Sequence, residues 1–287
     1  MDLKFMKKNN QYEHVKLDLP QSSGGSIDAN YAVISLNRPE KLNAITLKTL
    51  REIVDALESM ELDSNIGCVV LRGTKDYTKK PAFSTGADLS NPFEPGIKPS
   101  IPIHMTYAIT LFHNCFDRIE SFAKPLIAAV DGYALGGGFE LSLACDILIA
   151  SERSIFGFAE ILRGIFPSGG GTQRAVRNLG FSRSIKMLYF GERVSAKELY
   201  KNGYVSFLAK EGDEFEKMLH DKACMLGNSA TTALSIIKKC LKFGTEVSIP
   251  IGLQFEQLGF GVNSAAEDVQ EGIKAFLRKK EPKYQGY

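Results

Sequence analysis

The sequence has few of the residues on which several protein classes depend. It contains no Trp, five Cys and four His among 287 residues. The cysteines are odd in number and widely spaced, with no CxxC pair and no Cys/His cluster, which argues against a zinc site and a disulfide framework. The sequence also lacks a charge-free apolar run of about 18 residues, the length a membrane-spanning helix needs. We therefore expect no metal site, no disulfide scaffold and no membrane span.

An excess of charge of one sign is also lacking. Lys and Arg total 35 against 33 Asp and Glu, which gives a net charge of +2. A dedicated nucleic-acid binder usually has a clear basic excess, so this balance disfavours nucleic acid as a partner. Residues 1–11 carry lysines with no apolar run behind them, so we expect no signal peptide. Free cysteines in such a chain suggest the reducing cytoplasm.

The sequence does have the length and composition to build a large hydrophobic core. Of its 287 residues, 44% are hydrophobic, enough for an α/β core without crosslinks. Alternation of apolar and polar residues predicts a strand at 12–19, with 31–36 as its hairpin partner. Further strands are expected at 68–71, 126–130, 147–150 and 204–208.

Helical spacing of apolar residues appears in the remaining segments. A helix is predicted over 46–60, with Thr46 as its N-cap, and another over 102–121. Between the two lies the segment 73–102, which has four prolines near its end and is predicted to be a long loop. From residue 171 onward the chain is expected to be mainly helical.

Strands that alternate with helices predict an α/β fold with a parallel sheet. We place a boundary near residue 200, so that residues 1–200 form the α/β core. Residues 201–287 are then expected to form a helical C-terminal region.

Two glycine-containing turns could carry chemistry. In the turn 132–138, a strand runs into glycines and then into a helix, so free backbone N–H groups point at whatever occupies the turn. Phosphate binding fits poorly, because the glycines are out of register for GxGxxG and no GKS/T follows. An oxyanion hole and simple tight packing both stay open. The turn 82–88 could add another N–H group from a neighbouring strand end.

Two glutamates follow these turns. Glu160 lies among apolar residues, where burial would raise its pKa and let it hold a proton near neutral pH; the alternative is an ion pair with Arg163 or Arg174. Glu140 could share in proton transfer, or it could simply complement a helix dipole at the surface. The four histidines lie outside these segments, which disfavours a Ser-His-Asp or metal-dependent mechanism.

In this order, the segments resemble the crotonase (enoyl-CoA hydratase/isomerase) superfamily over nearly the whole chain. The matching motifs are NRPEKLNA at 37–44, FSTGAD at 83–88, GYALGGGFE at 132–140, CD at 145–146, PSGGGTQR at 167–174 and AFLRKK at 275–280. The resemblance implies an α/β fold with a core of spirally arranged ββα units. It also implies a helical C-terminal region that drives trimerisation, giving a homotrimer or a dimer of trimers.

The resemblance further implies an activity, most similar to that of a short-chain enoyl-CoA hydratase. The N–H groups of Ala87 and Gly137 would hold the thioester oxygen. Glu140 would be the base that activates water, and Glu160 would supply a proton to Cα. The acyl-CoA substrate would also involve Lys41, Leu42, Ser84, Thr85, Asp88, Gly136, Pro167, Ser168, Phe276 and Lys279. No cofactor is implied, because CoA arrives as part of the substrate.

Other functions stay open at this point. Isomerases and hydrolases of the superfamily usually keep one or neither of the two glutamates, and a relative without turnover could bind CoA esters or RNA. Two departures from the family pattern affect the site. Ser168 stands where a glycine is common, and the proline-rich loop 91–102 is longer than in compact members. Because Met105, Phe112 and Phe116 could close an acyl pocket or belong to the core, the acyl length stays open.

Overall fold

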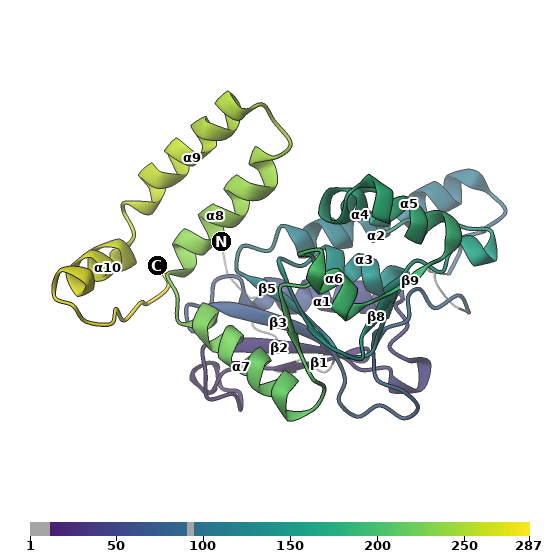
Figure 1. The fold of residues 1–287 in the computed structure, drawn as a ribbon, viewed down its shortest axis with the longest axis horizontal. Helices are drawn as coiled ribbons and strands as arrows, with labels where there is room; N and C mark the ends of the chain where they lie inside the picture. Colours follow the sequence, from purple (N-terminus) through teal and green to yellow (C-terminus); the bar gives the residue numbers. More distant parts are fainter. Residues whose placement is uncertain (1–11, 91–94) are drawn as a thin grey trace.

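The computed structural model describes residues 12–90 and 95–287, which form two β-sheets and the helices α1 to α10 (Figure 1). The predicted absence of a signal peptide concerns residues 1–11, and the proline-rich loop begins with residues 91–94. Both segments lie outside the described residues.

The larger sheet has six strands in the order β1–β2–β3–β5–β7–β10. β1 and β2 form an antiparallel pair, with Val15 opposite Leu36, and the other neighbours pair in parallel. The predicted hairpin and parallel sheet are therefore confirmed. The central strands have continuous apolar runs because both of their faces are buried. The bounds are β1 Val15–Asp18, β2 Tyr31–Leu36, β3 Cys68–Gly73, β5 Leu126–Val130, β7 Ile147–Ser151 and β10 Phe207–Ala209.

The smaller sheet, in the order β4–β6–β8–β9, is made of strands that the sequence analysis did not predict. Each has only three residues, too few to show a period-two pattern. They are β4 Ala82–Ser84, β6 Tyr133–Leu135, β8 Ile155–Gly157 and β9 Arg193–Ser195. The prediction of an unbroken loop over 73–102 is therefore wrong, because β4 lies within it. After residue 171 only the strand at 204–208 was predicted, and β9 is a second strand there.

The chain alternates between the two sheets in a repeating ββα order. Each unit has a strand of the larger sheet, then a short strand of the smaller sheet, then a helix. The three units are β3–β4–α2, β5–β6–α3 and β7–β8–α4. The helices are α2 Pro102–Glu120, α3 Gly137–Leu143 and α4 Gly171–Leu179. This arrangement confirms the expected ββα core. It also brings the ends of β4, β6 and β8, with the turns that follow them, to one region of the molecule.

Helices cover both faces of the larger sheet. On one face lies α1 (Leu47–Met60), which the Thr46 side chain caps together with Thr49, as predicted. On the other face α7 (Asp213–Gly227) packs Phe215, Leu219 and Ala223 against the central strands. The remaining helices of the body are α5 Phe181–Phe190 and α6 Ala196–Lys201, and the short 3₁₀ turns are Gln21–Ser23, Pro39–Lys41 and Ile161–Arg163.

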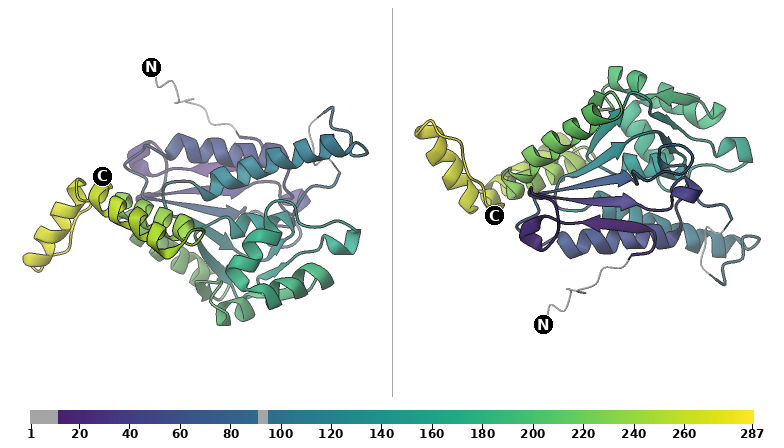
Figure 2. Two further views of the ribbon diagram at one scale, coloured as in Figure 1. Left: turned by 90° about the horizontal axis from the view of Figure 1, so that it is seen from above. Right: turned by 90° about the horizontal axis from the view of Figure 1, so that it is seen from below.

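The last three helices project from this body, and we refer to them as the arm. They are α8 Thr231–Gly244, α9 Ile249–Asn263 and α10 Glu267–Leu277. In both views of Figure 2 the yellow C-terminal end of the arm lies clear of the sheets. The C-terminal region is thus helical as expected, although the division of the chain at residue 200 stays a prediction. Among the helices of residues 12–90 and 95–287, none has the length and hydrophobicity to cross a bilayer.

Candidate active site

Two backbone N–H groups lie side by side where the turns after β4 and β6 meet. Ala87 forms a parallel bridge with Ile45 that uses the Gly86 carbonyl and the Asp88 N–H, so the bridge leaves the Ala87 N–H unused. Gly137 is the first residue of α3, and the N–H of a first helical residue has no acceptor within its own helix. An ideal Cβ built on Gly137 would lie 3.4 Å from the Ala87 nitrogen, so the two turns are in contact.

These amides are accessible, and they have the character of an anion-binding site. Ala87 is exposed and Gly137 is half-buried. The N-terminal end of α3 adds its partial positive charge at Gly137. Of the two interpretations left open by the sequence, the arrangement favours an oxyanion hole over simple packing, because neither Ala87 nor Gly137 is a buried residue and the bridge to Ile45 does not use the Ala87 N–H.

Glu140 lies one turn into α3 and is buried, with 4% of its surface exposed. Its Oε1 atom accepts hydrogen bonds from Gly169 N at 2.7 Å and Gly171 N at 2.8 Å. Burial raises the pKa of Glu140 to about 7; the nearby Glu160 charge adds to this rise, and the two backbone donors oppose it. A surface role for Glu140 is therefore excluded, and its carboxyl can exchange a proton near neutral pH.

Glu160 lies on the other side of the same glycine turn. An ideal Cβ on Gly136 would lie 2.7 Å from Glu160 Oε1, so the carboxylate is packed against the backbone just before Gly137. Burial raises the pKa of Glu160, and its Oε2 atom is buried with no hydrogen-bond partner among the described residues. The two predicted ion-pair partners are engaged elsewhere: Arg163 donates to the Ala159 carbonyl, and Arg174 pairs with Glu120.

A cavity of about 380 Å³ is lined by Thr85 and Leu135, which precede Ala87 and Gly137 in their turns. Its lining includes Leu42 and Thr85, two predicted substrate-binding residues, and the side chains of Lys79, Lys80 and Arg193 bring positive charge to it. Thr85 N also donates to the Leu42 carbonyl at 3.2 Å, which ties the turn after β4 to the 3₁₀ turn at Pro39–Lys41. Lys41 is exposed at the end of that turn.

Other predicted residues shape the turns around the site. Ser84 is fully buried, and its hydroxyl accepts from Gly86 N at 3.2 Å. Asp88 accepts from Arg38 Nη2 at 2.8 Å, and hydrogen bonds from Ser90 and Arg38 lower the pKa of Asp88 to about 2. These polar side chains position the loop that carries Ala87.

The segment after Glu160 brings further predicted residues to the glutamates. Pro167 is buried and Ser168 is half-buried, just before the Gly169 and Gly171 amides that hold Glu140. An ideal Cβ on Gly169 would lie 2.6 Å from the Phe116 ring. Phe116 therefore both belongs to the core and borders the turn.

The remaining candidates for the acyl pocket lie on α2. Phe112 is a core residue, and Met105 is half-buried. Phe116 is thus the one of the three that the structure places against the Gly169 turn.

Phe276 and Lys279 lie apart from the other predicted site residues. Phe276 is on α10, with 82% of its surface exposed, and Lys279 follows the end of that helix. Because α10 lies on the projecting arm (Figure 1), the fold of this chain does not bring these two residues to the glycine turns.

The sequence analysis did not predict the contacts that two side chains make at the site. His113 on α2 donates from Nε2 to the Ser168 carbonyl at 2.7 Å, although the histidines had been set aside because they lie outside the motifs. Arg174 on α4 donates to the Gly169 carbonyl at 3.0 Å. His113 and Ser168 are 55 residues apart, so no local pattern indicates their contact. Arg174 and Gly169 are five residues apart in the motif at 167–174, and that motif was the one signal for Arg174.

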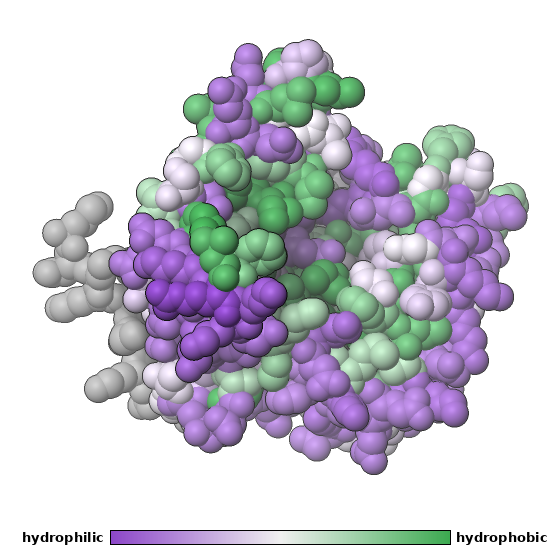
Figure 3. Space-filling view, turned by 60° about the vertical axis from the view of Figure 1, so that its left-hand side comes forward, coloured by the Kyte–Doolittle hydropathy of each residue, from purple (hydrophilic) through white to green (hydrophobic). Residues whose placement is uncertain are grey.

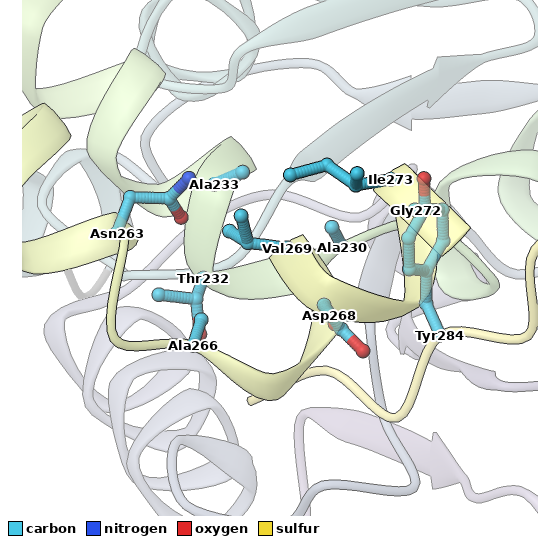
Figure 4. A pocket seen from close by; sticks show the side chains of 10 residues that line it. All are labelled: Ala230, Thr232, Ala233, Asn263, Ala266, Asp268, Val269, Gly272, Ile273 and Tyr284. Atoms are coloured by element: carbon cyan, nitrogen blue, oxygen red, sulfur yellow. The ribbon is translucent and has the colours of Figure 1, made fainter. Parts of the chain in front are cut away.

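A second cavity, of about 270 Å³, lies within the arm and not at the glutamates. Figure 4 shows its lining side chains, among them Val269 and Ile273 of α10 and Tyr284 of the tail. Asp268 lies beside it and accepts hydrogen bonds from Gln285 N at 2.7 Å and Gly286 N at 2.9 Å. The cavity thus reflects how the C-terminal tail folds back on the arm.

A substitution at Gly136 tests how tightly Glu160 is placed. Gly136 has φ +51° and faces Glu160 Oε1, so we expect Gly136→Ala to displace the carboxylate and to lower turnover about tenfold. Gly164→Ala is the matched control, because Gly164 has φ +70° but nothing within 4 Å of an added Cβ. Gly164→Ala should lose about 1 kcal/mol of stability in urea unfolding, because Gly164 has left-handed helical angles. Gly136→Ala should lose more, because its ψ of −126° lies outside that region and its Cβ meets the carboxylate, and only this variant should lose kcat. Equal kcat values would contradict the tight placement.

Comparison with known proteins identifies the family to which the chain belongs. Residues 26–287 match the family model described as enoyl-CoA hydratase/isomerase. The 2,3-dehydroadipyl-CoA hydratase of Escherichia coli is 35% identical over 254 residues, which cover 88% of this chain and 94% of that protein. The short-chain-enoyl-CoA hydratase of Clostridium acetobutylicum is 32% identical over 253 residues, covering 88% and 93%. The crystal structure of enoyl-CoA hydratase from Bacillus anthracis superposes with a TM-score of 0.84 at 30% identity, covering 96% and 100%. A family model that spans most of the chain, together with this fold, shows that the protein belongs to the enoyl-CoA hydratase/isomerase family.

Proposed function

We propose that the protein is an enoyl-CoA hydratase, which adds water reversibly across the double bond of a 2-enoyl-CoA to give a 3-hydroxyacyl-CoA. The observation that carries the proposal is a pair of glutamates on either side of the Gly136–Gly137 turn, next to the Ala87 and Gly137 amides: Glu140 is buried, and Glu160 is half-buried with its Oε2 atom enclosed. Isomerases and hydrolases of the family usually keep fewer glutamates at these positions.

The amides supply the electrostatic part of the mechanism. Cβ of an enoyl thioester is a poor electrophile until the carbonyl oxygen takes up negative charge. Fixed N–H donors at Ala87 and Gly137, aided by the end of α3, would stabilise that enolate-like oxygen. Each such donor is worth about 3 kcal/mol of transition-state stabilisation in other oxyanion holes.

The glutamates supply the proton transfers. Glu140, with its pKa near 7, takes a proton from the water that attacks Cβ, and Glu160 gives a proton to Cα. One proton is taken and one is given, and the water's OH ends on Cβ. The proton on Glu140 then returns through solvent to Glu160, which restores both glutamates for the next turnover. Since no electrons are gained or lost, the reaction balances without a redox cofactor. Dehydration of a 3-hydroxyacyl-CoA is the same sequence in reverse.

The CoA part of the substrate would occupy the cavity lined by Leu42 and Thr85. The cationic side chains of Lys79, Lys80 and Arg193 fit the phosphate groups of CoA by charge. With its free cysteines, the enzyme would work in the reducing cytoplasm.

The arm supports a trimeric assembly, or a dimer of trimers, as the state in which the enzyme works. Neither α8 nor α9 has a buried residue, and large apolar side chains such as Leu253, Leu258 and Phe260 are between 56% and 75% exposed. Figure 3, with the arm side turned forward, shows hydrophobic surface in green around a hollow. In such an assembly Phe276 and Lys279 would reach the CoA site of a neighbouring subunit.

We expect Leu258→Asp to weaken this assembly by more than tenfold in dissociation constant, because a charge would enter an apolar interface. Leu62→Asp is the control, since Leu62 lies on the body and is 83% exposed. Light scattering at micromolar concentration should show a trimer or hexamer for the wild type and the control, and a smaller species for Leu258→Asp. A monomeric wild type would contradict the assembly.

The direct test of the function is to mix the protein with crotonyl-CoA and to follow the loss of the conjugated enoyl-thioester absorbance, with 3-hydroxybutanoyl-CoA as the product standard. Fast loss with formation of that product supports the hydratase. If CoA esters bind but neither crotonyl-CoA nor longer or cyclic 2-enoyl-CoA esters are hydrated, the hydratase proposal is wrong. Isomerisation of a 3-enoyl-CoA or release of free CoA would then identify the other family chemistries.

A further inference from the structure

The turn that holds Glu140 is itself held by Arg174, which the proposed chemistry does not use. Gly169 N donates to Glu140 Oε1 at 2.7 Å, and the carbonyl of the same Gly169 accepts from Arg174 Nη1 at 3.0 Å. The guanidinium lies so close to the turn that an ideal Cβ on Gly170 would be 2.0 Å from Arg174 Nη1. Gly169 therefore links the Glu140 carboxylate to one fixed cation.

On its other side, Arg174 is fixed by two carboxylates of α2. Its Nε and Nη2 atoms donate to Glu120 Oε2 at 2.8 and 2.6 Å, and Nη2 also donates to Asp117 Oδ1 at 3.0 Å. The Arg174 side chain is 13% exposed and that of Glu120 is 31% exposed, whereas Asp117 is 70% exposed, so Glu120 is the less screened of the two partners. A planar guanidinium can serve Glu120 and the Gly169 carbonyl at once, which a single ammonium group cannot do in the same geometry.

Glu120 also meets the arm. It is the last residue of α2, and Lys242 Nζ on α8 lies 3.5 Å from Glu120 Oε1 and 3.3 Å from the Glu120 carbonyl oxygen. A continuous set of polar contacts thus runs from the arm through Glu120 and Arg174 to the Gly169 peptide and Glu140.

We propose that Arg174 is a positioning residue, which holds the Gly169 peptide and thereby the Glu140 carboxylate against the frame formed by α2 and the arm. The effect that we expect on turnover rests on the proposed hydratase function. Without the guanidinium, the Gly169 peptide can turn and the hydrogen bond to Glu140 loses its fixed direction. A small misplacement of an acid–base group lowers turnover by about 100-fold, while groups that bind CoA elsewhere are untouched.

The test compares Arg174→Gln and Arg174→Lys with Arg177→Gln. Arg177 lies one turn further along α4, where it donates to Gln173 and pairs with Glu246 of the arm. Its hydrogen bonds to the described residues do not include the Gly169–Gly171 turn. We expect kcat on crotonyl-CoA to fall 10- to 100-fold in both Arg174 variants, with KM within about threefold of the wild type. Arg177→Gln should keep kcat within about threefold.

A second readout does not depend on activity. Hydrogen exchange measured by mass spectrometry on peptides that cover residues 167–175 should be faster in both Arg174 variants and unchanged in Arg177→Gln. Arg174→Lys keeps the charge near Glu120 and guards against a variant that fails to fold. Exchange at 167–175 equal to the wild type, or kcat losses equal to those of Arg177→Gln, would overturn the inference. If the wild type hydrates no enoyl-CoA, the proposed function fails, and the exchange result alone decides the role of Arg174.

Discussion

Replacing Glu140 with Gln is expected to lower kcat for crotonyl-CoA hydration by about 100- to 10,000-fold. The amide can still accept hydrogen bonds from the Gly169 and Gly171 amides through its remaining oxygen, so the turn keeps its shape. It cannot take a proton from water, however. Binding of the CoA ester should change little, because Glu140 lies apart from the cavity lined by Leu42 and Thr85.

The control for this variant is Glu152→Gln, which removes a carboxylate that pairs with Lys197 outside the site. Steady-state kinetics on both variants, with equilibrium binding of butanoyl-CoA, separate catalysis from binding. Glu140→Gln activity within tenfold of the wild type would remove Glu140 from the mechanism.

The same substitution is expected to stabilise the protein at alkaline pH. The folded-state pKa of Glu140, about 7, lies above its usual value of 4.5, so folding penalises the charged form. This penalty is absent below about pH 4.5, grows as the pH rises to 7, and then amounts to about 3 kcal/mol, or 1.36 kcal/mol for each unit of pKa. Gln has no charge to bury and no such penalty.

Urea unfolding of the wild type and of Glu140→Gln at pH 5 and at pH 8 measures this effect. The quantity compared is the difference in unfolding free energy between the two proteins at each pH. The stability of Glu140→Gln relative to the wild type should rise by up to about 3 kcal/mol between the two pH values, because titrating groups that do not interact with Glu140 cancel. A relative stability independent of pH would mean that Glu140 does not hold its proton as burial predicts. Lower activity with higher stability is typical of a residue kept for catalysis.

The elements that the sequence predicts well are those with long, regular patterns. The strands at 31–36, 68–71 and 126–130 are apolar runs in the buried sheet, and the helix with the Thr46 cap has both its spacing and its start signal in the chain. The strands of the smaller sheet have no such pattern in their sequences. Its three-residue strands are held by partners far along the chain, as where Ala82 pairs with Tyr133.

For the candidate site, the backbone turns could be predicted and their environment could not. Glycines before a helix indicate available backbone N–H groups, and this holds whichever residues pack against the turn. The burial of Glu140 depends on the amides of Gly169 and Gly171, which the chain reaches only after β7 and β8. The contact between His113 and Ser168 likewise forms only when α2 packs beside that turn.

Replacing Glu160 with Gln should lower hydration by a similar factor of about 100 to 10,000, but through the other proton transfer. Its Oε2 atom, buried without a hydrogen-bond partner among the described residues, is free to hold the proton that Cα receives. Burial raises the pKa of Glu160, which favours the protonated donor. Gln keeps the size of the side chain and loses only that exchangeable proton.

Exchange of the α-hydrogens of butanoyl-CoA in D₂O can separate the two glutamates. Butanoyl-CoA has no double bond to hydrate, so the exchange needs the oxyanion hole and the group that faces Cα, but no activated water. We expect Glu160→Gln to slow this exchange at least 100-fold and Glu140→Gln to slow it less than about tenfold, measured by NMR. The reverse order would exchange the two assigned roles. Equal loss in both variants would mean that the glutamates act as one coupled pair, for which separate roles cannot be assigned.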